Sequence, residues 1–188
     1  MTMSDPLVLP PRGRVWTIDD LTQLTDDGNR YELVDGSLLV SPHANIRHGS
    51  VANRLRDRLS VQAPPEFCVG QDIGVNIHAR RTYYVPDIFV VHEAALGRDG
   101  ACFEPDEVLL VVEVLSKDNK SHDVVLKRHD YAKAGIQQYW IVDPDARTLM
   151  VLGDITQRSY RLLAEVRPGE EWASEHPFPL RLDPAQFC

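Results

Sequence analysis

Hydrophobic and polar residues recur along the chain with two spacings, the alternation typical of strands and the longer period typical of helices. Residues 31–40 predict two short strands around Asp35-Gly36, a pair typical of hairpin turns. Between residues 44 and 61 apolar residues recur at roughly helical spacing, and Pro64-Pro65 ends the pattern. A short helix over 17–21 is expected before the hairpin, because Thr17 can cap it. The apolar face of the longer helix is expected to carry Ile46, Val51, Leu55 and Leu59.

Strand patterns dominate the rest of the chain. Alternation predicts strands over 67–77 and 83–91, and the nearly continuous apolar run 108–115 predicts a central strand covered on both faces. A helix that Ser121 can cap is predicted to follow and to run to Ala134, with Gly135 placed to end it. Further strands are predicted over 138–142, 148–152 and 159–164, and the proline-rich tail from 168 onward shows no clear pattern.

These elements predict an α/β or α+β fold, a mixed central β-sheet flanked by helices. The length of 188 residues suits one domain at about 150 residues per domain. We expect that domain to span 15–188. Residues 1–14 are rich in proline and arginine without an apolar period, which predicts a flexible N-terminal arm.

Composition and charge narrow the class of protein. The chain is 43% hydrophobic and 26% charged, as in ordinary soluble proteins. Its net charge of −8 counts against a protein that coats nucleic acid through bulk electrostatics, but not against a site whose carboxylates hold divalent cations. No apolar run approaches the roughly 20 residues of a membrane span, and no signal peptide is evident. With three scattered cysteines, a cytoplasmic location without membrane partners is expected.

Two acids stand alone in apolar strands. Glu113 lies in VLLVVEVL and Asp87 in YYVPDIFVV. A buried unpaired carboxylate would cost several kcal/mol or take up a proton, so such a residue is paired or binds a metal. A buried ion pair or a strand-end carboxylate explains Glu113 alone about as well. If the two strands are neighbours, however, both acids meet. Together with the Val114 carbonyl they would suit Mg²⁺ or Mn²⁺.

Three further residues are weaker candidates. Lys127 follows the Glu113 strand and could bind a phosphate or the attacking water, although an exposed lysine paired with Asp123 is the simpler interpretation. Glu32 alone resembles an ordinary surface acid. His48 alone is more often a structural residue than a catalyst.

Other chemistries find little support. The sequence has no GxSxG, no GxGxxG and no P-loop. Its histidines form no paired zinc spacing. A two-carboxylate glycosidase is disfavoured because the aromatic residues do not cluster around the two acids.

Five segments in order resemble the PD-(D/E)XK nuclease superfamily, and more specifically its Uma-type family of putative restriction endonucleases. They are YELVDGSLLVSP, the helix containing His48, VPDIFVV, VVEVLS and DVVLKRHDYAKAGIQQYWIVDP, which together span roughly residues 17–152. One position departs from the superfamily pattern, since Leu115 stands where a lysine is usual. Lys127 in the following helix fits a variant in which that lysine has migrated.

The resemblance implies a restriction-endonuclease-like fold and a Mg²⁺- or Mn²⁺-dependent endonuclease acting on nucleic acid, with DNA as the first choice. It implies that Asp87, Glu113 and the Val114 carbonyl hold the metal. Glu32 would orient a water or a second metal, and Lys127 would steady the attacking hydroxide. A homodimer is a further implication. Leu115 and the acidic charge leave open a catalytically inactive binding or assembly module. An RNA-directed enzyme or another phosphodiesterase with the same site also stays open.

Overall fold

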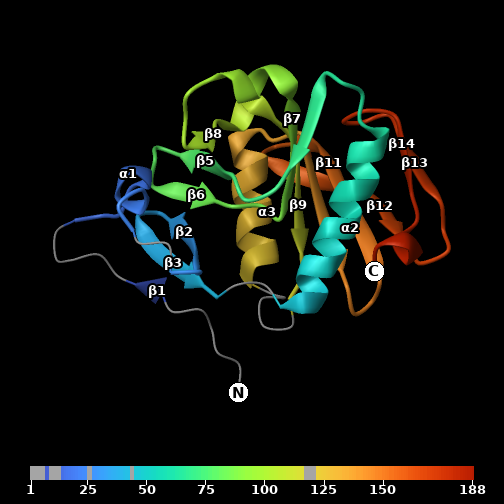
Figure 1. Cartoon of the computed structure of the whole chain (residues 1–188), viewed down its shortest axis with the longest axis horizontal. Coiled ribbons are helices and arrows are strands. Elements are labelled where there is room, and N and C mark those ends of the chain that lie inside the picture. The colour runs from blue at the N-terminus through green and yellow to red at the C-terminus, as the bar shows by residue number, and fades with distance from the viewer. Residues whose placement is uncertain (1–6, 9–13, 25–26, 43–44, 117–121) are drawn as a thin grey trace.

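The computed structural model describes residues 7–8, 14–24, 27–42, 45–116 and 122–188 (Figure 1). Its α-helices in these ranges are α1 (Ile18–Leu21), α2 (Ile46–Gln62) and α3 (His122–Ala134). No helix in these ranges is long and apolar enough to cross a membrane.

Six strands form the central sheet in the order β12-β11-β10-β9-β7-β4. All neighbours run antiparallel except β9 and β10, which are parallel, so the sheet is mixed as expected. The bounds are β4 (Phe67–Gly70), β7 (Ile88–His92), β9 (Val108–Val114), β10 (Gln138–Asp143), β11 (Thr148–Thr156) and β12 (Ser159–Val166).

A second sheet has the order β1-β3-β2-β6-β5-β8. Its strands are β1 (Leu7–Val8), β2 (Arg30–Val34), β3 (Ser37–Ser41), β5 (Gly74–His78), β6 (Thr82–Tyr84) and β8 (Cys102–Phe103). The predicted hairpin is therefore present as β2 and β3, and within the expected arm Leu7 and Val8 pair with β3. The rest of that arm, apart from Arg14, lies outside the described residues.

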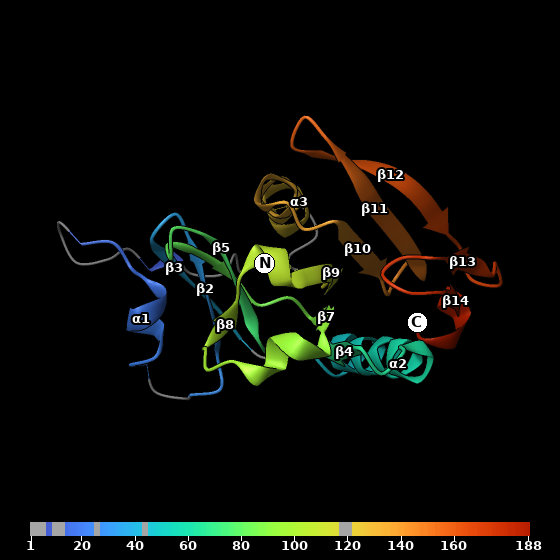
Figure 2. The ribbon, with the colours of Figure 1, turned by 90° about the horizontal axis from the view of Figure 1, so that it is seen from above.

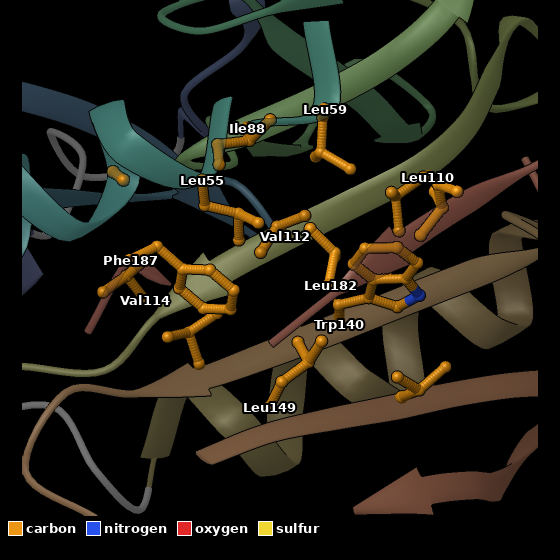
Figure 3. Packing of buried hydrophobic residues seen from close by; sticks show 14 of the residues in the cluster. Leu55, Leu59, Ile88, Leu110, Val112, Val114, Trp140, Leu149, Leu182 and Phe187 are labelled. Atoms are coloured by element: carbon orange, nitrogen blue, oxygen red, sulfur yellow. The ribbon is translucent and has the colours of Figure 1, made fainter. Parts of the chain in front are cut away.

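The central sheet is covered on both faces (Figure 2). α3 lies on one face and α2 on the other, so β9 is buried on both sides as its apolar run predicts. Alternation along β9 sends Leu110, Val112 and Val114 to the α2 side (Figure 3). Val111 points to the α3 side, and Glu113 shares that side because side chains two apart in a strand face the same way.

Two segments that were predicted to form one strand each are in fact divided into two strands. The segment 67–77 divides into β4 and β5, which belong to different sheets, and Asp72 between them has a left-handed backbone with φ of 63°. The segment 83–91 likewise divides into β6 and β7 around Pro86, which has no N–H to donate to a ladder. The chain thus crosses between the sheets at the two places where regular alternation suggested unbroken strands.

Two further expectations are corrected. Ile46 does not belong to the buried face of α2, because it lies at the first turn and is 93% exposed. The tail from 168 onward forms a hairpin of β13 (Trp172–Ser174) and β14 (Leu180–Leu182), and its apolar side chains complete the α2-side core (Figure 3). The cap predicted at Ser121 lies outside the described residues, whereas Gly135 ends α3 with φ of 90°.

Candidate active site

All the Asp, Glu, Lys and His residues that are buried in the described ranges gather in one place. These residues are Glu32, His48, Asp87, Glu113 and Lys127, each no more than 8% exposed. Burying a charge is costly unless it is paired, so a cluster of five titratable groups in a protein of this size indicates a functional site. Together with Arg30, which contacts Asp87, they are called the buried charged cluster below.

Strand pairing brings the two lone acids together. Ile88 of β7 pairs with Val112 of β9 in an antiparallel register, which places the preceding Asp87 beside Glu113. The backbone N–H of Val114 donates to Asp87 Oδ2 at 2.8 Å. The carboxylates therefore meet at the end of the central sheet, where the ladder between the two strands stops.

Lys127 reaches the same point from α3. Its Nζ donates to Glu113 Oε1 at 3.1 Å and to Glu32 Oε1 at 2.9 Å. Tyr131, one turn later on the same helix face, donates its hydroxyl to Glu113 Oε1 at 3.0 Å. Lys127 is only 3% exposed, so the interpretation of an exposed surface lysine is wrong. The side chain of its suggested partner, Asp123, lies outside the described residues.

Glu32 joins the second sheet to the site. Its Oε1 accepts the backbone N–H of Val85 at 2.8 Å as well as the Lys127 ammonium. The first bond holds β2 against the segment that leads through Pro86 into Asp87. Glu32 is thus a buried acid at 3% exposure, not the surface acid that its own position suggested.

Asp87 is held by two further cationic or polar donors. Arg30 Nη1 lies 2.9 Å from Asp87 Oδ1, and His48 Nε2 lies 3.0 Å from Oδ2. His48 comes from the first turn of α2, where Asn45 caps the helix by accepting the His48 N–H. Sequence reasoning missed Arg30. The one available signal was its spacing of two from Glu32 in β2, which places both residues on one face of that strand.

The two acids have opposite pKa shifts. Burial alone would raise the pKa of Asp87, but the hydrogen bond from His48 and the charge of Arg30 outweigh it and lower the pKa to about 2. Burial raises the pKa of Glu113 to about 7 against the opposing charge of Lys127, and the negative charges of Asp87 and Glu32 add to the rise. Neighbouring carboxylates with separated pKa values are a common feature of catalytic sites.

The oxygen atoms of the cluster fit a hard divalent cation. In the described part of the chain no hydrogen bond reaches Oε2 of Glu113 or Oε2 of Glu32, so each acid has an oxygen to offer. No three His, Cys, Asp or Glu side chains there form a complete ligand group. Mg²⁺ needs no such group, because it is usually held by one or two carboxylates and keeps several waters.

Comparison with known proteins identifies the family. The family model for Uma2, described as "Putative restriction endonuclease", matches residues 18–185, which include every member of the buried charged cluster.

The chain belongs to the Uma2 family.

The fold of the Uma2 chain is similar to that of a solved nuclease-like structure. It is a crystal structure of a putative nuclease belonging to DUF820 from Anabaena variabilis, with a TM-score of 0.69 and 19% sequence identity. The alignment covers 91% of the present chain and 96% of the Anabaena chain. The expected nuclease-like fold of a mixed sheet flanked by helices is thereby confirmed. No curated protein matches the chain.

Proposed function

We propose that this Uma2 protein is a divalent-cation-dependent endonuclease that hydrolyses phosphodiester bonds, with DNA as its substrate. One observation carries the proposal: Asp87 and Glu113 meet from neighbouring strands in a buried site, and Lys127 contacts Glu113 from the following helix. Family membership over residues 18–185 supports the same assignment.

Asp87 and Glu113 would hold Mg²⁺ or Mn²⁺, with the adjoining Val114 carbonyl as a third oxygen ligand. A cation bound there would acidify water and screen the negative charge of the phosphate. His48 keeps Asp87 oriented through the contact of its Nε2 with Asp87 Oδ2. Together with the Arg30 guanidinium and the Val114 N–H, this contact fixes the direction of the Asp87 carboxylate before any ligand arrives.

Lys127 supplies the positive charge nearest to Glu113. Its ammonium would orient the attacking water and stabilise the negative charge that develops on the phosphate oxygens. The lysine is held in place by Glu32 and by the Tyr84 ring, whose centroid lies 5.3 Å from Nζ. Lys127 of α3 would thus supply the positive charge that the superfamily pattern places at the position of Leu115.

The direct test is cleavage of supercoiled plasmid by purified protein with Mg²⁺ or Mn²⁺. We expect nicked and linear products from wild type, none in EDTA, and at least a hundredfold slower cleavage by Asp87→Asn and by Lys127→Met, the range reported for removing one electrostatic catalytic group. Asp154→Asn, an exposed acid on β11, serves as the matched control and should cleave normally. Absence of cleavage by wild type, or full activity in Asp87→Asn, would contradict the proposal. Parallel assays on RNA and on small diesters test the choice of DNA.

A second candidate is a non-catalytic binding or assembly module with the nuclease fold. The observation that favours it is that both Asp87 oxygens already accept hydrogen bonds from protein donors. Such a module would show no metal-dependent change in melting temperature. A rise on adding Mn²⁺ would count against it, since a ligand bound only by the folded state stabilises that state.

A further inference from the structure

Arg30 differs from the rest of the buried charged cluster in its access to solvent. Its side chain is 29% exposed, against 3% for Asp87 and 10% for Glu113. The side chains of Lys127 and Glu32 are each 4% exposed, so they too are closed off from the surface. A phosphodiester arriving from solution therefore meets the Arg30 guanidinium before it meets any other cation of the cluster.

The guanidinium also has unused donors. Nη1 alone is engaged, with Asp87 Oδ1 at 2.9 Å and the Val85 carbonyl oxygen at 3.4 Å. In the described part of the chain Nε and Nη2 of Arg30 have no protein partner, and neither belongs to the buried polar atoms that lack one. These N–H groups are thus open to solvent, and the planar fork of arginine matches two oxygens of a phosphate.

The charges of the cluster call for an anion once a divalent cation binds. When all three are ionised, the carboxylates Glu32, Asp87 and Glu113 face two permanent cations, Arg30 and Lys127. His48 beside Asp87 adds a positive charge only when it is protonated. With His48 neutral, a divalent cation would turn this excess of one negative charge into an excess of one positive charge. One phosphodiester group restores neutrality, and the solvent-facing side of Arg30 is the place where its oxygens would find free donors.

We propose that Arg30 is a substrate-binding residue that exchanges partners: it neutralises Asp87 in the metal-free protein and binds the phosphodiester when Asp87 gives Oδ1 to a divalent cation. This inference rests on the proposed function. It assigns to Arg30 a competition with the cation for Asp87 and a contact with the substrate. A residue with a merely structural role would do neither.

The test separates metal binding from DNA binding in Arg30→Ala and Arg30→Lys. Mn²⁺ affinity is measured by calorimetry, and DNA affinity by anisotropy of a fluorescein-labelled duplex in Ca²⁺. We expect Arg30→Ala to bind DNA roughly tenfold or more weakly, in line with loss of a charge-assisted hydrogen bond. Its Mn²⁺ affinity should be roughly threefold or more higher, because a competing charge-assisted hydrogen bond to Asp87 is gone. Arg30→Lys keeps the charge but lacks the fork, so it should bind Mn²⁺ like wild type and DNA more weakly.

Arg161→Ala, which removes an exposed arginine of β12 paired with Asp154, is the control and should leave both affinities unchanged. Wild-type DNA affinity in both Arg30 variants would overturn the inference while leaving the proposed function intact. A loss of Mn²⁺ affinity as large as the loss of DNA affinity would also overturn it, because Arg30 would then only hold Asp87 in place. If wild type neither binds Mn²⁺ nor cleaves DNA, the proposed function itself fails and this inference falls with it. Should Arg30→Ala not fold, Arg30→Lys alone decides between these outcomes.

Discussion

Glu113 binds its proton more strongly in the folded protein than in the unfolded chain. Its pKa of about 7 lies above the ordinary 4.5, so between these values the folded state binds the proton more strongly than the unfolded chain does. The stability that this group contributes is fully present below pH 4.5 and is lost as the pH rises through 7.

This linkage predicts the behaviour of Glu113→Gln in EDTA. Gln cannot ionise, so the melting temperature of the variant should gain on that of wild type as the pH rises from 5 to 8. Thermal unfolding followed by circular dichroism measures the difference. The exposed Glu165→Gln is measured alongside as the matched surface substitution. A difference between Glu113→Gln and wild type that stays constant from pH 5 to 8 would contradict the account.

Lys127 should matter for stability as well as for activity. Removing its ammonium in Lys127→Met leaves Glu32 and Glu113 buried without the cation they share, and loss of one partner of a buried ion pair costs about 3–5 kcal/mol. Denaturant unfolding at pH 8 measures this free energy. Lys133→Met in the same helix removes an exposed lysine and should change stability by less than about 0.5 kcal/mol. Similar values for the two variants would show that Lys127 is not paired as described.

Individual site residues could be predicted from the sequence where a charged residue interrupts an apolar strand. Asp87 and Glu113 were predictable because their neighbours are apolar, and the pairing of β7 with β9 brings them together. Arg30 was not predictable, since an arginine at the start of a strand resembles a surface residue until the fold places Asp87 beside it. The burial of Lys127 was also hidden, because α3 has no strong apolar stripe to show which face is covered.

β4 and the neighbouring β7 pack closely at Gly70. A Cβ added at Gly70 would lie 2.3 Å from the ring of Phe89, the partner of Gly70 in β7. Gly70→Ala should therefore destabilise the protein by about 1–3 kcal/mol, as overpacking of a core does. Gly49→Ala in α2 is the matched control, because its Cβ meets nothing within 4 Å and should stabilise the helix by roughly 1 kcal/mol. Chemical denaturation of both variants tests this, and the same sign for both would contradict it.

The C-terminal segment is a structural element and not a loose tail. Phe187 is fully buried beside Val114 and Leu55 in the α2-side core (Figure 3). Phe187→Ala should cost about 3–5 kcal/mol of unfolding free energy through lost burial and a cavity. Leu163→Ala, at a residue 40% exposed on β12, should cost far less. Equal melting temperatures for the two variants would mean that the segment does not complete the core.

Element prediction succeeded where a helix or a strand is regular and failed where the chain turns between sheets. The runs in β9 and in α2 determine their own secondary structure through apolar spacing. The divisions of 67–77 and 83–91 depend on which sheet each half joins, and strand alternation carries no information about that choice. The elements of the tail were not predicted because its prolines interrupt any regular apolar spacing. Four of its apolar residues are nevertheless buried: Phe178, Leu180, Leu182 and Phe187.

For the whole molecule, the net charge of −8 and the contents of the cluster lead to one interpretation. Three of the acids lie in the buried site with two permanent cations, Arg30 and Lys127, and with His48, which adds a positive charge only when it is protonated. Under the proposed function, a divalent cation bound there would leave an excess of positive charge, which a phosphodiester would then offset. On the proposed function, the protein would act on nucleic acid at this local site and would not depend on bulk electrostatic attraction.

The measurement that tests this account most directly is a calorimetric titration of Mn²⁺ into wild type and Asp87→Ala at pH 8. We predict binding by wild type and its loss in Asp87→Ala, with the exposed Asp154→Asn binding like wild type. The titration is repeated with a short DNA duplex present, so that a site completed by substrate is also detected. Absence of Mn²⁺ binding by wild type under both conditions, or equal binding by Asp87→Ala, would contradict the assignment of Asp87 and Glu113 as the metal-binding carboxylates of this Uma2 protein.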